Sequence, residues 1–165
     1  MSKPVRSTTR IPATVEAVVA LRTSERWVAM KASQLHDGSV LVRRVERPDG
    51  GIDLAVSREL PSGVPGFLER FLPAEGKVVQ HESWGPPDAD GVCTGSWSVD
   101  LPGAPARLGG TSTLAPDGEG CLHTIVGTVS VSIPLVGGRA ESFVAEMTEK
   151  LMAKEAELMV ASLSA

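Results

Sequence analysis

Residues 121–136 read CLHTIVGTVSVSIPLV, and residues 137–162 continue as GGRAESFVAEMTEKLMAKEAELMVAS. The odd positions from His123 to Ile133 are mostly apolar, whereas the even positions are mostly Thr or Ser. This alternation indicates a strand with one buried face. After Gly137-Gly138, helical spacing places one apolar stripe on a long helix, formed by Phe143, Met147, Leu151, Leu158 and Ala161. Because such a stripe must be covered, the stretch predicts a helix clasped by a sheet.

The rest of the chain supplies that sheet. Two short helices are expected after the first strand, because Pro12 suits the first turn of a helix and Thr23 or Ser24 can cap the next one. Residues 62–72 are expected to interrupt the sheet as a short flap. The predicted strands cover residues 5–11, 40–47, 52–60, 77–84, 92–101, 106–114 and 121–135. This order, without an internal repeat or linker, predicts a single α+β domain over residues 1–165, in which a seven-stranded curved antiparallel sheet wraps around the C-terminal helix.

Composition excludes several classes of partner. Hydrophobic residues make up 42% of the chain and charged residues 22%, which is typical of a globular protein. A formal net charge of −4 argues against binding to nucleic acid or to an anionic membrane. No apolar run approaches the roughly 20 residues that a membrane span needs, and the N-terminus lacks the apolar core of a signal peptide. We therefore expect a cytoplasmic protein without stable membrane insertion.

Motifs for metals and cofactors are weak. The chain has no Gly-x-Ser-x-Gly motif, no phosphate-binding glycine loop and no paired-cysteine motif, so no cofactor is expected. Cys93 and Cys121 are expected to be buried thiols, since nothing else indicates an oxidising compartment. A metal held by His81, His123 and Cys93 is conceivable, but three ligands on separate strands are a weak signal, and no metal site is predicted.

Two segments carry a resemblance to a known superfamily. Residues 11–15 read IPATV after the opening strand, and residues 129–141 read VSVSIPLVGGRAE before the long helix. With the order of elements, they resemble the START-like superfamily, also called the SRPBCC or Bet v 1-type helix-grip fold, which includes polyketide cyclases and lipid-transfer domains. Gly120-Cys121 and residues 133–138 are similar to a bacterial branch known as a domain of unknown function. The resemblance implies an internal cavity for an apolar ligand, and it implies no particular catalytic residues.

Pairing the strands by their turns predicts the floor of such a cavity. One row of register partners is His81, Gly95, Ser112 and His123, and the neighbouring row is Val79, Trp97, Gly110 and Ile125. The first row would place a small polar patch on an otherwise apolar floor, under a roof of Phe143, Met147 and Leu151. This hypothesis requires both histidines to lie on the same face of the sheet. The alternative for each of these residues is ordinary core packing, which is commoner for inward histidines than catalysis.

An arginine is a further candidate for the inner face. Arg43 and Arg44 are adjacent in a predicted strand, so one should point inward or pair with a carboxylate such as Glu59. An inward arginine could bind a ligand carboxylate, whereas an exposed ion pair would contribute little.

Three functions remain open from the sequence. The first is a non-enzymatic protein that binds or carries a hydrophobic small molecule, such as a lipid or a polyketide-like compound, on His81, Trp97, Ser112, His123, Ile125, Phe143, Met147 and Leu151. The second is an enzyme of the cyclase or dehydratase type, in which His81 or His123 acts as general acid or base. The third is a protein-interaction domain with a collapsed cavity. The volume of the space between sheet and helix separates the third function from the other two.

Overall fold

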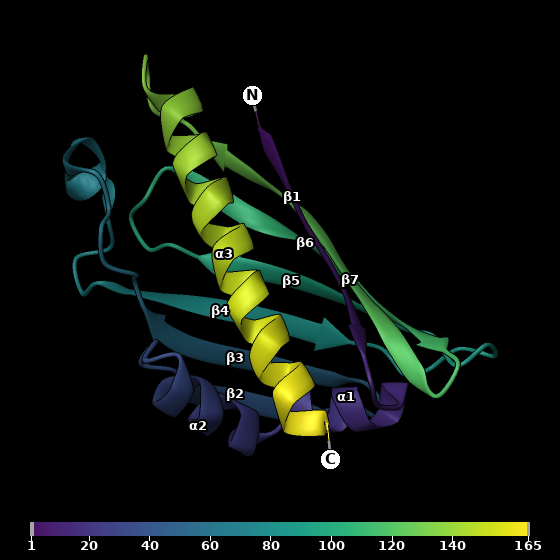
Figure 1. Cartoon of the computed structure of the whole chain (residues 1–165). Helices are drawn as coiled ribbons and strands as arrows, with labels where there is room; N and C mark the ends of the chain where they lie inside the picture. The colour runs from purple at the N-terminus through teal and green to yellow at the C-terminus, as the bar shows by residue number, and fades with distance from the viewer. Residues whose placement is uncertain (1, 165) are drawn as a thin grey trace.

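The computed structural model describes residues 2–164 as one sheet with three α-helices and a short 3-10 helix (Figure 1). The strands are β1 (Lys3–Ile11), β2 (Val40–Glu46), β3 (Ile52–Glu59), β4 (Lys77–Trp84), β5 (Cys93–Asp100), β6 (Ala106–Asp117) and β7 (Gly120–Val131). The α-helices are α1 (Val15–Arg22), α2 (Glu25–Gln34) and α3 (Gly137–Leu163), and the 3-10 helix is η1 (Gly66–Phe71). This order is the predicted one.

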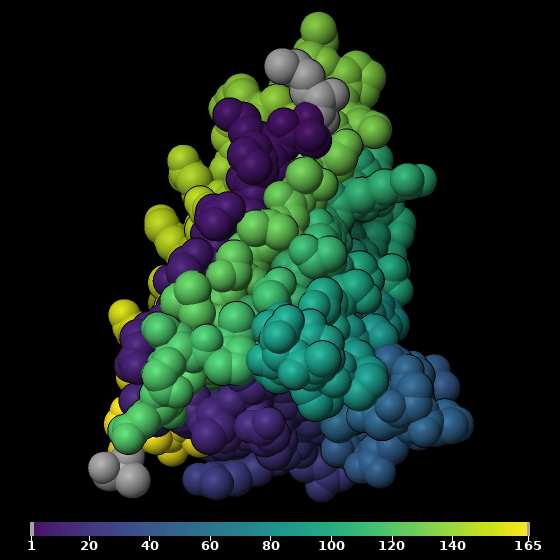
Figure 2. All heavy atoms as spheres, turned by 90° about the vertical axis from the view of Figure 1, so that its right-hand side faces the viewer, coloured from purple at the N-terminus to yellow at the C-terminus, as the bar shows by residue number. Residues whose placement is uncertain are grey.

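The seven strands form one antiparallel sheet in the order β1-β7-β6-β5-β4-β3-β2. Helix α3 runs diagonally across one face of the twisted sheet, while α1 and α2 lie together at one end (Figure 1). Seen from the edge formed by β1 and β7, the yellow-green spheres of α3 lie to one side of the sheet (Figure 2). The predicted α+β helix-grip fold is therefore confirmed.

Local sequence explains where the short helices begin. The side chain of Thr14 accepts a hydrogen bond from Ala17 N at the start of α1, and Ser24 does the same for Trp27 N at the start of α2. Such caps satisfy amide groups that the first helical turn leaves free. Ser24, one of the two predicted cap residues, is confirmed as the cap of α2. Pro12 lies before α1 rather than in its first turn.

The predicted register of β5 and β6 is confirmed, with Gly95 opposite Ser112 and Trp97 opposite Gly110. A Cβ atom on Gly127, which lies opposite Gly110 on β7, would meet Trp97 Cζ2 at 2.5 Å. Trp97 Nε1 donates to Val126 O at 3.3 Å. The glycines thus allow a large ring to lie close to the sheet.

The predicted register of β6 and β7 is wrong by two residues. Ser112 lies opposite Ile125, and His123 lies opposite Leu114. The hairpin is tighter than expected, because β6 continues to Asp117 and Gly118 takes a positive φ of 61° in the turn. Since side chains alternate with a period of two, this error keeps His123 on the inner face.

The predicted register of β4 and β5 is wrong by three residues, and this error changes the face. Trp84, not His81, lies opposite Gly95. The turn is centred beyond Pro86 and Pro87, because Asp88 Oδ1 accepts from Asp90 N and Val92 N while Gly91 N donates to Asp88 O. An odd shift moves every side chain of the strand to the opposite face. His81 consequently points away from α3.

The buried stripe of α3 also differs from the predicted one. Ala161 is exposed, and Phe143, Met147, Leu151 and Leu158 are only partly buried. The helix packs chiefly against β1 and β7, which turns a neighbouring stripe toward the sheet. That stripe is Ala140, Glu141, Ala145, Met152, Glu155 and Met159. Two carboxylates in it could not be recognised from apolar spacing. No helix among the described residues is long and apolar enough to cross a membrane.

Candidate functional site

Charged side chains gather beneath the C-terminal half of α3, inside the grip. Arg22, at the end of α1, and Glu82, on the inner face of β4, are both buried. Arg22 Nε lies 2.8 Å from Glu82 Oε1, and the same oxygen accepts from Trp84 Nε1 at 3.2 Å. Burial lowers the pKa of Arg22, but Glu82 and Glu155 outweigh this effect and raise it. Arg22 therefore keeps its charge inside the protein, beside the Glu82 carboxyl group.

A second buried pair joins α2 to α3. Lys31 Nζ lies 3.2 Å from Glu155 Oε1, and both side chains are almost entirely removed from solvent. Burial alone would raise the pKa of Glu155, but Lys31, Arg22 and Arg58 hold it below its ordinary value. The two ion pairs therefore belong to one electrostatic group that connects both ends of the chain.

Arg58, on β3, also belongs to this group, but it has few hydrogen-bond partners of its own. It lies opposite Val78 on the inner face, and Nε donates to Gln80 Oε1 at 3.4 Å, which is a long hydrogen bond to a neutral group. Burial lowers the pKa of Arg58, although Glu155 and Asp37 act in the opposite direction. Within residues 2–164, no carboxylate forms an ion pair with it.

His123 is the histidine of the inner face. It is buried, and its Nε2 has no hydrogen-bond partner among the described residues. Burial, with help from the nearby Arg22, lowers the pKa of His123 from 6.5 to about 3. The imidazole is therefore neutral near pH 7. Its ring centroid lies 6.2 Å from that of Trp84.

The space between sheet and helix is nearly filled. A cavity of about 10 Å³ beside His123 is lined by residues that include Arg22, Glu155 and Met159. That is close to the smallest space that holds one water molecule. A much larger open hollow, of about 840 Å³, lies over Ser98, Gly109 and Thr128, on the face of the sheet away from α3. The internal cavity that the resemblance implies, which the sequence left as either open or collapsed, is therefore nearly closed in this structure.

The structure separates the two histidines that the sequence had placed together. His81 is exposed on the outer face, where Nε2 lies 3.1 Å from Asp100 Oδ2 at the margin of the large hollow. The predicted polar patch of two histidines does not exist. Val79, the predicted partner of Trp97, moves to the outer face together with His81. By contrast, Trp97, Ser112, His123 and Ile125 are all buried on the inner face.

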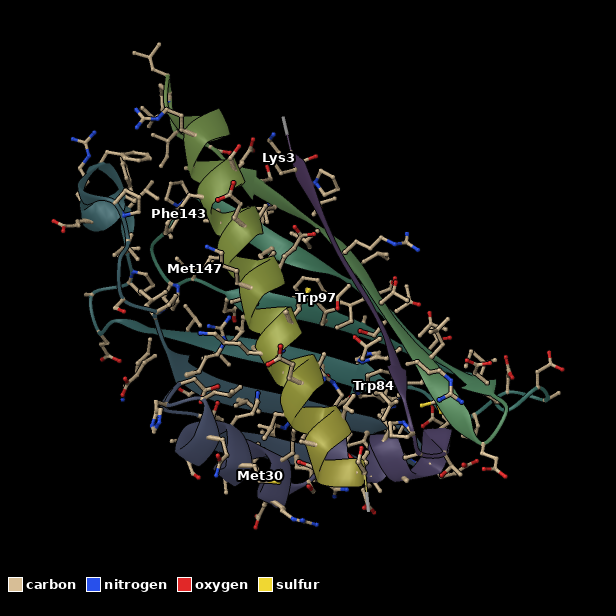
Figure 3. The ribbon with its side chains drawn as sticks, in the orientation of Figure 1. Lys3, Met30, Trp84, Trp97, Phe143 and Met147 are labelled. Carbon is tan, nitrogen blue, oxygen red and sulfur yellow. The ribbon has the colours of Figure 1, made fainter. Side chains whose placement is uncertain are left out.

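The predicted roof residues occupy one flank of α3. Phe143 and Met147 lie on the side of the helix that faces η1 (Figure 3), and Leu151 follows one turn later. All three are partly buried rather than enclosed. Phe143 packs on an apolar cluster around Leu68, Ile133 and Ala140.

Sequence reasoning missed the charged residues of the site, namely Arg22, Lys31, Arg58, Glu82 and Glu155. One signal was available, since Glu155 continues the row of Phe143, Met147 and Leu151 at a spacing of four residues. Of the two arginines considered, Arg44 does turn inward, but Nε donates to Thr23 O at 2.7 Å and Nη1 pairs with Glu46. Neither Arg43 nor Arg44 forms an ion pair with Glu59 in the part of the chain that the structure describes.

Cys93 and Cys121 are free and buried, as predicted, and burial raises the pKa of both thiols. Among residues 2–164, no three His, Cys, Asp or Glu side chains are placed to hold a metal ion. The conceivable set of His81, His123 and Cys93 is divided between the two faces of the sheet.

Comparisons with solved structures show the same fold. A START superfamily protein from Mycobacterium smegmatis superposes with a TM-score of 0.53 and 17% identity, over 97% of this chain and 98% of that chain. The ZhuI aromatase/cyclase from Streptomyces sp. R1128 gives a TM-score of 0.57 and 10% identity, over 99% of this chain and 94% of that chain. At these identities the likeness concerns the fold alone.

Sequence comparison identifies the family. The uncharacterized protein Rv0481c of Mycobacterium tuberculosis is 30% identical over 110 residues, which make up 65% of this chain and 63% of that protein. The match thus spans less than two thirds of the relative's length. The model of the family "Protein of unknown function (DUF2505)" matches residues 6–163. The chain therefore belongs to the DUF2505 family, and it has the START-like helix-grip fold.

Proposed function

We propose that the protein binds an apolar small molecule with a polar group between α3 and the inner face of the sheet. The observation that carries this proposal is Nε2 of the buried His123, which has no hydrogen-bond partner among the described residues. Arg58, partly buried on the same face of the sheet, adds donors that no described side chain uses. Buried polar groups usually have partners, because an unpaired one costs free energy. A bound ligand would supply these partners, and the surrounding apolar side chains would supply most of the affinity.

Binding requires α3 to move, because the internal cavity of about 10 Å³ is far too small for such a ligand. The helix is fastened along one flank, where Glu149 Oε2 accepts from Arg6 N at 3.0 Å and Glu141 Oε2 accepts from Val131 N at 2.9 Å. Its opposite flank, with Phe143 and Met147, is only partly buried. We infer that this flank parts from the sheet and from η1 when a ligand enters.

The acid/base enzyme has less support. His123 is uncharged at neutral pH and cannot donate a proton from an imidazolium ion there, since its pKa is about 3. His81 lies on the other face of the sheet, so the two residues cannot act on one bound substrate. Binding without chemistry is the function that the site supports best.

The test is a titration of the purified protein with N-phenylnaphthylamine, a neutral apolar dye, followed by dye fluorescence and by the emission of the tryptophans. We expect saturable binding that Met147→Glu abolishes, because it places a charge on the flank that opens. Ala153→Glu is the matched control, because Ala153 is exposed on the same helix. Absence of saturable binding, together with no copurifying apolar compound in organic extracts, would overturn the proposal and favour a protein-interaction domain.

A further inference from the structure

Arg58 has more hydrogen-bond donors than the described side chains around it use. A guanidinium group carries five N–H donors in a planar fork that fits a carboxylate or phosphate. The one hydrogen bond from Arg58 to a side chain within residues 2–164 uses Nε and ends on the amide oxygen of Gln80. The two terminal nitrogens make no side-chain hydrogen bond or ion pair in the described structure.

The other two cations of the group are already matched. Arg22 is paired with Glu82, and Lys31 is paired with Glu155. Asp37 acts on Arg58 only at a distance: its Oδ1 accepts from Ser39 N, and its Oδ2 is buried without a partner. Arg58 is therefore the cation of this group that lacks a carboxylate in contact.

An apolar row on α3 leads to this position. Phe143, Met147, Leu151 and Glu155 succeed one another at four-residue steps, so they form one ridge along the helix. The first three are apolar and partly exposed, and the ridge begins beside η1 (Figure 3). It ends at Glu155, whose charge interacts with Arg58. A row of this kind suits a flexible chain with one charged end.

We propose that the ligand is a long-chain monocarboxylic acid, with its carboxylate on the terminal nitrogens of Arg58 and its chain along Phe143, Met147 and Leu151. This inference rests on the proposed function and names the ligand class for the same site. A single arginine fork matches one planar carboxylate with two parallel hydrogen bonds. Glu155 and Asp37 stand close enough to influence Arg58, so they disfavour a doubly charged head such as a phosphate monoester.

The experiment displaces N-phenylnaphthylamine from the full chain with dodecanoate, dodecanol or dodecyl phosphate at about pH 8, where the carboxylic acid is ionised. We expect dodecanoate to bind about tenfold more tightly than dodecanol, which corresponds to one charge-assisted contact. Arg58→Gln should remove this preference by weakening dodecanoate alone. Arg43→Gln, on the exposed outer face of the neighbouring strand, should change neither affinity.

A second variant covers the case in which Arg58→Gln fails to fold. Asp37→Asn removes a competing negative charge, so it should tighten dodecanoate severalfold and leave dodecanol unchanged. Equal affinities for acid and alcohol would overturn the carboxylate while leaving the proposed function intact. Tighter binding of dodecyl phosphate would replace the carboxylate by a phosphate. Failure of all three compounds to displace the dye would also overturn the carboxylate, and failure of the dye itself to bind would overturn both proposals.

Discussion

Replacing Glu82 by Gln tests whether the buried ion pairs are coupled to the fold as the distances indicate. Glu82 Oε1 accepts from both Arg22 Nε and Trp84 Nε1, and Arg22 and Glu82 are each less than one tenth exposed. Removing one partner of a buried pair typically costs 3–5 kcal/mol, because the other charge remains buried. The amide still accepts a hydrogen bond and Glu155 still faces Arg22, so we expect a loss near the lower limit, about 3 kcal/mol.

For a chain of 165 residues, this loss corresponds to a decrease in melting temperature of about 6–12 °C. The assay is urea unfolding followed by circular dichroism, with Glu82→Gln, Arg22→Met and the double variant Arg22→Met/Glu82→Gln in one thermodynamic cycle. The double variant should be more stable than Glu82→Gln, because it leaves no buried charge unpaired. A loss below about 1 kcal/mol for Glu82→Gln, or strictly additive losses around the cycle, would refute the reasoning.

Three further predictions concern single positions. The unfolded chain protonates His123 near its ordinary pKa of 6.5, whereas the folded protein does so only near about 3, so stability is complete above pH 6.5 and falls as the pH decreases through this window. His123→Gln should abolish a loss of about 2 kcal/mol between pH 8 and pH 5, and an identical loss in both proteins by urea unfolding would contradict this account. Gly110→Ala should destabilise the fold by about 2–3 kcal/mol in the same assay, because its Cβ would meet the backbone at Val126. In the control Gly138→Ala, at the start of α3, the Cβ meets open space, so this substitution should be neutral or stabilising by up to about 1 kcal/mol. Leu135→Gly should raise the melting temperature by relieving a backbone φ of 69° at a fully exposed leucine, and a decrease would show that the leucine makes a stabilising contact.

The fold could be predicted because its determinants are local. Alternation from Cys121 onward and the cap at Ser24 each depend on a few neighbouring residues. The register of β4 and β5 could not be predicted in the same way. A turn centred on residues 86–90 would place His81 opposite Gly95, but hydrogen bonds to Asp88 from Asp90 N and Val92 N centre the turn farther along the chain.

The candidate site was predicted only in its apolar half. The burial of Trp97 and Ile125 could be predicted from alternation, because apolar residues at every second position of a strand indicate its buried face. Alternation does not predict the burial of Arg58, Glu82 and Glu155. A charged residue in a strand or helix is usually solvated, and its burial depends on a partner that is distant in sequence. Glu82 and its partner Arg22 are separated by 60 residues. Such pairs become visible only when the sheet and both ends of the chain are assembled.

The position of α3 at the end of the element order bears on how the protein is made. During synthesis, the inner face of the sheet stays uncovered until residues 137–163 have been produced. The ion pair between Lys31 and Glu155 forms only after Glu155 has been produced. A nascent sheet with a purely apolar face would be prone to aggregate at this stage. Arg58 and Glu82 lie on that face, and their charges keep it hydrated before the helix covers it. The charges that the finished protein hides therefore also protect the unfinished one.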